Sequence, residues 1–323
     1  IKATGDVRLR YLGSKKNKTT KEYNAYDGKH SKFDMRGRVQ FNAKVNDKTS
    51  AVIRVTSGDM EFGDAKGNKS GDARFDQVYV AHKFGSSATL IGGRFPLMVG
   101  AGLAYDDNFD GAGLVLGNGK HVQGVLGYGS MVEGTVRDAE LDAKHNARVW
   151  LAQAKVGNLE QGKSIGGFYL GVADRFDTGI KQLDGLKGVY GFNADYNINK
   201  IWVGGEWLKG KFDRDAKGTK ATAWVAGLGY GKYDQAKAGT WDIKAQYFNQ
   251  KKYAPIVSST WNQAYDLSNS LLKDQNGYKG WMATVDYALA DNVGLSGYYG
   301  FHGKNQDGQK VSDFYRAELN YKF

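Results

Sequence analysis

The chain has 323 residues with 45 glycines, two prolines, no cysteine and 13% aromatic residues, and its mean hydropathy is −0.55. The lack of cysteine excludes a disulfide framework and thiolate chemistry, and no apolar run reaches the ~18 residues that a membrane-spanning helix requires. The formal net charge of +11 suits binding to nucleic acid or anionic lipid as well as a pore that attracts anions, so the placement of the charges has to decide.

The first two strands that the pattern predicts cover residues 3–12 and 33–46. In 33–45 every odd position is apolar or glycine and every even position is polar or charged. A period of two over this length predicts an extended strand with one apolar and one charged face. Strands of soluble proteins are usually ~5–6 residues long, whereas ~9–11 tilted residues cross a membrane. The length therefore predicts a strand of a membrane barrel, in which only alternate residues meet lipid.

The same alternation returns along the chain, most clearly in 241–249, 281–289 and 315–323. It is blurred in 73–84 and in 147–157, where both faces are apolar, a pattern that would suit packing against another subunit or an inward-folded loop. We predict sixteen strands, at 3–12, 33–46, 50–57, 73–84, 88–95, 111–117, 121–129, 147–157, 165–174, 187–197, 201–212, 220–231, 240–251, 277–290, 293–303 and 312–323.

The connections between these strands mostly alternate between short and long. Short ones fall at 46–48, 85–87, 118–120, 198–200 and 290–292, and long ones at 13–32, 58–72, 96–110, 130–146, 175–186 and 252–276. Short turns on one side and long loops on the other are typical of a membrane barrel, with both termini on the short-turn side when the strand number is even. We therefore predict an all-β fold, a transmembrane antiparallel β-barrel of sixteen strands that occupies residues 1–323 as a single domain.

Three segments resemble known families. Residues 314–323, which end on Phe323, resemble the C-terminal signal of bacterial outer-membrane proteins. Residues 92–96, Gly-Gly-Arg-Phe-Pro, with the later segment 105–111, Tyr-Asp-Asp-Asn-Phe-Asp-Gly, resemble the fifth strand and the inward-folded third loop of general diffusion porins. Residues 5–11 resemble the first barrel strand of porins that an S-layer-homology domain tethers to the cell wall in diderm Firmicutes, although that domain is absent from residues 1–323.

The resemblance implies a porin of the bacterial outer membrane, with an inward-folded constriction loop, through which small hydrophilic solutes and ions diffuse. It also implies a homotrimer that contacts outer-membrane lipid. The lysine-rich segment 15–21 fits either a solvated loop or contact with anionic lipopolysaccharide. The chain opens without the features of a signal peptide, which we expect to have been removed. We expect no nucleic acid partner, because the strands have the length that lipid requires.

The charged faces predict the constriction of the pore. Adjacent strands lie ~4.8 Å apart, so arginines on the inward faces of the first five strands could form a ladder along one wall. Loop 96–110 with its aspartates would lie across from them, and the resulting field would orient dipolar solutes and disfavour apolar ones. The predicted constriction residues are Arg8, Arg10, Arg36, Arg38, Arg54, Arg74, Arg94, Asp106, Asp107 and Asp110. We expect a mild anion preference, partly cancelled by these aspartates.

Other interpretations of the same residues stay open. The arginines would be solvated on any polar lumen face, and the aspartates could cap loop turns or bind calcium, the one cofactor considered. The five histidines lack metal-ligand spacing and no catalytic motif is present, so we expect no enzyme. Alternative functions are a solute-specific channel for sugars or anions, and a mainly structural barrel that anchors the envelope.

Overall fold

A computed structural model describes most residues of the chain. They are 1–15, 31–64, 72–133, 137–138, 145–174, 176–177, 185–213, 221–259 and 277–323. Apart from Lys15, the lysine-rich segment 15–21 lies outside them. Within these ranges the regular structure is β-strand except for one 3-10 turn, Leu159–Gln161. No helix in the described part of the chain is long and apolar enough to cross a membrane.

Sixteen long strands of the described residues form one sheet. They are β1 (Lys2–Ser14), β2 (Ser31–Lys44), β3 (Thr49–Thr56), which β4 (Met60–Glu61) continues, β5 (Arg74–Phe84), β6 (Ala88–Val99), β7 (Tyr105–Leu116), β8 (Val122–Met131), β10 (Arg148–Asn158), β11 (Lys163–Val172), β13 (Leu186–Ile198), β14 (Ile201–Phe212), β15 (Thr222–Gly231), β16 (Trp241–Gln250), β17 (Tyr278–Ala290), β18 (Val293–Lys304) and β19 (Phe314–Lys322). The short strands β9 (Arg137–Asp138) and β12 (Phe176–Asp177) pair with each other outside this sheet.

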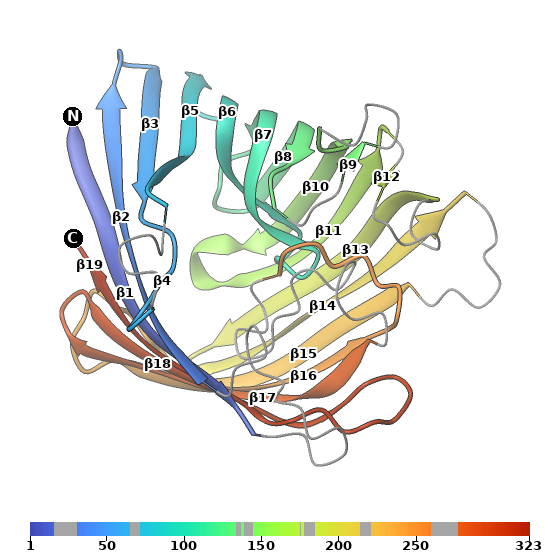
Figure 1. Ribbon diagram of the computed structural model, residues 1–323. Coiled ribbons are helices and arrows are strands. Elements are labelled where there is room, and N and C mark those ends of the chain that lie inside the picture. Colours follow the sequence, from blue (N-terminus) through green and yellow to red (C-terminus); the bar gives the residue numbers. More distant parts are fainter. Residues whose placement is uncertain are drawn as a thin grey trace.

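The sheet closes on itself. Each long strand pairs antiparallel with the strands before and after it, and β1 pairs with both β2 and β19. Figure 1 shows the strands wrapped around a common axis, with the two termini on neighbouring strands. Because the sheet is closed, the long strands have neighbours on both sides and no open sheet edge remains. An open edge would leave backbone N–H and C=O groups without partners in the hydrocarbon region of a bilayer. The predicted all-β antiparallel barrel of sixteen strands is thereby confirmed.

The outer surface of the barrel is apolar. Along β14 the side chains of Ile201 and Val203 are half exposed, whereas Glu206 and Leu208 on the opposite face are buried. Aromatic side chains also stack between neighbouring strands on the outside, as Phe192 does on Trp207 with ring centroids 6.2 Å apart. An apolar outer face is the arrangement that a lipid environment stabilises.

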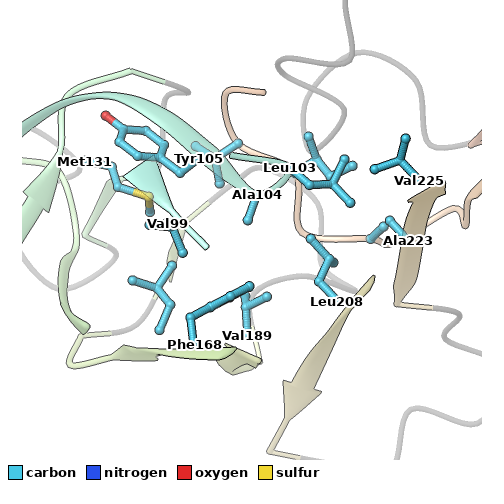
Figure 2. Packing of buried hydrophobic residues seen from close by; sticks show 14 of the residues in the cluster. Val99, Leu103, Ala104, Tyr105, Met131, Phe168, Val189, Leu208, Ala223 and Val225 are labelled. Atoms are coloured by element: carbon cyan, nitrogen blue, oxygen red, sulfur yellow. The ribbon is translucent and has the colours of Figure 1, made fainter. Parts of the chain in front are cut away.

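The hydrophobic core lies inside the barrel. The tip of the β6–β7 hairpin, with Leu103, Ala104 and Tyr105 at most 1% exposed, packs on buried residues of the inner wall. Figure 2 shows Leu103 near Leu208 of β14 and Val225 of β15. Apolar loop tips therefore cover one part of the inner wall and exclude water from it.

A second segment, residues 254–258, lies against this tip. Its backbone N–H of Val257 donates to the carbonyl oxygen of Ala104 at 2.9 Å, and the carbonyl oxygen of Ser258 accepts from the N–H of Asp106 at 2.7 Å. The covered inner wall explains why 147–157 is apolar on both faces, since Leu151 is buried inside the barrel while Trp150 is exposed outside it. Of the two explanations offered for that pattern, packing against an inward-folded loop is correct for the inner face.

Candidate functional site

The hairpin of β6 and β7 narrows the interior. Its turn consists of residues 100–104, which is shorter than the predicted loop 96–110 because both strands continue beyond their expected ends. Asp106, Asp107 and Asp110 consequently lie on β7. Gly100 has a φ of +58°, and a side chain there would collide with the carboxylate of Glu206. Glycine is therefore required at the point where the chain turns into the barrel.

Two wall residues hold the turn in place. Glu206 of β14 is 3% exposed, and its carboxylate accepts hydrogen bonds from the backbone N–H of Ala101 at 2.6 Å and of Leu103 at 2.8 Å. Gln153 of β10 accepts from the N–H of Gly100 at 2.8 Å and donates to the carbonyl oxygen of Met98 at 3.0 Å. These bonds satisfy backbone groups of the turn that would otherwise be buried without partners. The arrangement holds the turn against the inner wall between β10 and β14, away from the strands that it connects.

The arginines of β1 bind carboxylates inside the barrel. Arg8 is 8% exposed, and its Nη2 lies 2.7 Å from Oδ1 of Asp59. Arg10 binds Asp34 with two parallel hydrogen bonds of 2.9 and 2.5 Å and also reaches Asp59 at 3.2 Å. A bidentate arginine–carboxylate pair is both strong and geometrically specific. Both guanidinium groups are therefore held rigidly in the wall.

The next strands continue this network. Asp6 lies between Arg38, at 2.8 Å, and Arg36, at 3.6 Å. Arg54 of β3 binds Asp76 of β5 through two hydrogen bonds of 2.9 and 2.7 Å. Because positive and negative groups alternate, this part of the wall carries fixed charge of both signs and not the ladder of positive charge that the sequence predicts.

Arg74 and Arg94 differ from the arginines of the wall. Arg94 binds Asp110 across the hairpin with hydrogen bonds of 2.6 and 2.8 Å, and both side chains are almost half exposed. Arg74, at the start of β5, donates to the backbone carbonyl of Asp72 at 3.4 Å. The sequence predicts that the loop aspartates lie across the pore from the arginines. Asp110 instead pairs directly with Arg94 on the neighbouring strand.

A cavity of about 220 Å³ brings most of the predicted residues together. Its lining includes Arg36, Arg38, Arg54, Arg74, Arg94, Asp59, Asp76, Asp107 and Glu133. Arg8 and Arg10 reach it through Asp59, whereas Asp106 and Asp110 are not part of the lining. Burial raises the pKa of the Glu133 carboxyl and the nearby Asp107 adds to the shift, against the opposing effect of Arg74 and Arg94.

No family model matches the sequence, and no curated protein matches it. Solved structures do resemble the fold. A mutant of the Rhodopseudomonas blastica porin matches with a TM-score of 0.60 and 12% identity, covering 100% of this chain and 99% of that chain. The chain has the porin fold. A loop-deletion mutant of OmpT, an outer membrane protein of Vibrio cholerae, matches with a TM-score of 0.57 and 14% identity, covering 100% of this chain and 98% of that one.

Within this porin fold, the acidic partners of the arginines were missed by the sequence reasoning. Two of them had a visible signal, because Asp6 and Asp34 stand two positions before Arg8 and Arg36 and so share their strand faces. Asp76 had none, since its inward orientation depends on a register shift between β3 and β5. On β19, Arg316 and Glu318 add a further pair, with Nε and Oε2 2.7 Å apart.

The aspartates of β7 do not form a metal site. Asp107 accepts a hydrogen bond from the hydroxyl of Ser258 at 3.1 Å, which ties β7 to segment 254–258. Asp110 is bound to Arg94. Among the residues that the structure describes, no three histidine, aspartate or glutamate side chains are placed to hold a metal ion. The calcium alternative therefore gains no support from the porin-fold barrel.

Proposed function

We propose that the chain forms a water-filled pore through which small hydrophilic solutes and ions diffuse passively. The observation that carries the proposal is the network of guanidinium and carboxylate groups on the inner wall of a barrel whose outer face is apolar. Ionised side chains at membrane depth are stable where they pair with one another or face a water-filled lumen. They are unstable where they face the hydrocarbon chains of the lipid. Such a wall is suited to the passage of hydrated solutes.

The proposal includes the cellular location of the barrel and its oligomeric state. The barrel, taken as a single domain over residues 1–323, lies in the bacterial outer membrane as a homotrimer, in contact with outer-membrane lipid and lipopolysaccharide. It needs no cofactor and catalyses no reaction. Support comes from the closed porin fold and its apolar outer face.

The constriction is assigned to the predicted residues together with their new partners. Arg8, Arg10, Arg36, Arg38, Arg54, Arg74 and Arg94 form its basic groups, with Asp106, Asp107 and Asp110 on the hairpin and Asp6, Asp34, Asp59 and Asp76 on the wall. Because the wall arginines are paired, the anion preference is weaker than bare arginines would produce. Fixed charges also act on passing ions only within about 8 Å at physiological salt.

A planar bilayer tests the proposal. Purified full-length protein is expected to insert with discrete conductance steps, and three equal closing steps would reveal the trimer. Small sugars are expected to enter liposomes that contain the protein, whereas larger oligosaccharides are excluded. Correctly folded protein that inserts but conducts no ions would refute the pore.

A second candidate is a mainly structural barrel with a closed lumen. It is favoured by one observation, the apolar tips of 103–105 and 254–257 that fill part of the interior. The same bilayer experiment separates the two, because a plugged barrel inserts without conductance steps and admits no small sugar.

A further inference from the structure

A larger cavity lies at the end of the barrel where the strands are joined by short turns. Its volume is about 760 Å³, and it is lined by residues of β11, β13, β14, β15 and β16 together with the connections between them. Among these is Trp202, which follows the tight turn between β13 and β14. Neither the predicted constriction nor its acidic partners line this cavity.

Trp202 forms a flat floor in this cavity. A Cβ atom at Gly204 would come within 2.6 Å of the indole ring, and one at Gly227 within 2.7 Å, so the ring occupies the space that side chains would fill. The indole N–H donates to the carboxylate of Asp195. The ammonium of Lys244 stands 4.9 Å from the ring centroid. Glycines on the wall and a bonded N–H therefore hold the indole against the wall, with the ammonium of Lys244 near the ring.

The connection between β15 and β16 encloses the cavity from another side. Tyr233 lines the cavity, and its hydroxyl occupies the space above Gly294 of β18. The next residue but one, Gln235, donates from its side chain to the carbonyl oxygen of Asn320 at 2.9 Å and accepts at its own carbonyl from the N–H of Asn292 at 2.8 Å. The segment is thus anchored to the ends of β18 and β19, and the cavity has a formed wall on this side.

The lining of this cavity carries charged groups of both signs. The ionisable side chains with formal charge are Lys163, Lys232, Lys244, Glu160, Asp195 and Asp242. The ammonium of Lys163 lies over the ring of Tyr196, 5.5 Å from its centroid, whereas the amides of Asn197 and Asn199 add donors and acceptors to the lining. A cavity of this kind offers hydrogen-bond donors and acceptors next to an aromatic face.

We propose that this cavity binds neutral sugar rings. The C–H face of a pyranose can stack on the indole of Trp202, while its hydroxyl groups donate to carboxylates and accept from ammonium and amide groups. Lys244 turns from the ring to a hydroxyl when the sugar arrives. The cavity would thereby retain sugars that have passed the hairpin. That sugars reach it through the lumen rests on the proposed pore, whereas their binding to the cavity does not.

Saturation-transfer NMR on the full chain in detergent tests the site. Glucose is expected to bind, and its open-chain counterpart sorbitol, which has no stacking face, to bind at least about tenfold more weakly. Glucosamine and glucuronate, which carry one charge each, are expected to bind no better than glucose. Trp202→Ala is expected to abolish glucose binding, whereas Trp281→Ala, which removes an indole from the outer face, is expected to leave it unchanged.

A second variant blocks the stacking face by a different change. Gly227→Val keeps the indole in the chain but places a side chain where the ring lies, and it too is expected to abolish binding. Equal binding of glucose by the wild type and Trp202→Ala, stronger binding of either charged analogue, or no glucose binding by the wild type would each overturn the proposal. Failure of the pore would instead appear as a lack of conductance in bilayers with sugar binding intact.

Discussion

Replacing Glu206 by glutamine is expected to release the turn 100–104 from β14. Both carboxylate oxygens of Glu206 accept from backbone N–H groups, of Ala101 and of Leu103. A glutamine side chain keeps one acceptor and presents an N–H donor to the other site, so one buried donor loses its partner. Such a loss costs about 1–3 kcal/mol, which lowers the ratio of bound to released turn roughly 5- to 150-fold.

Hydrogen exchange measures this release without reference to conduction. In Glu206→Gln the amides of Ala101 and Leu103 are expected to exchange at least about fivefold faster than in the wild type, the lower limit of that free-energy cost. Bilayer currents are expected to become noisier as the turn moves. Glu160→Gln, which removes an exposed carboxylate at the short-turn side, serves as the control. Unchanged exchange at both amides would show that Glu206 does not hold the turn.

Replacing Arg36 and Arg38 together by glutamine is expected to shift the ion preference of the pore toward cations. Asp6 lies between the two guanidinium groups and would be left without either of them. Loss of a unit positive charge about 4–8 Å from the path lowers the energy of a passing cation and raises that of an anion by about 0.5–1 kcal/mol each in water, so the permeability ratio of cations to anions is expected to rise roughly fivefold or more.

Reversal potentials in a salt gradient measure this ratio. The double variant Asp6→Asn with Arg38→Gln removes one charge of each sign, so its reversal potential is expected to stay close to that of the wild type. High salt is expected to reduce the shift of Arg36→Gln with Arg38→Gln, because screening acts on charges in water. A shift toward anions, or none at all, would mean that the arginines of β2 lie away from the path of the ions.

The sequence specified the wall of the barrel closely. The predicted strand 201–212 matches β14 in both bounds, and 33–46 matches β2 within two residues at each end. This succeeds because the alternation of lipid-facing and lumen-facing positions is a local constraint, which every strand must satisfy residue by residue. The same parity placed Arg8 and Arg36 on the inner face and, had it been applied to acids, would have placed Asp6 and Asp34 beside them.

The interior was decided by the tertiary structure alone. Glu206 is 105 residues from Ala101, to which it binds, and Ser258 is 151 residues from Asp107. No periodicity reports on contacts over such separations, because they form only after the closed wall has brought distant strands together. By itself the sequence determined the number of strands and the alternation of their faces. Where the hairpin rests, which carboxylate each arginine binds and which part of the lumen is dry follow only from closure of the barrel.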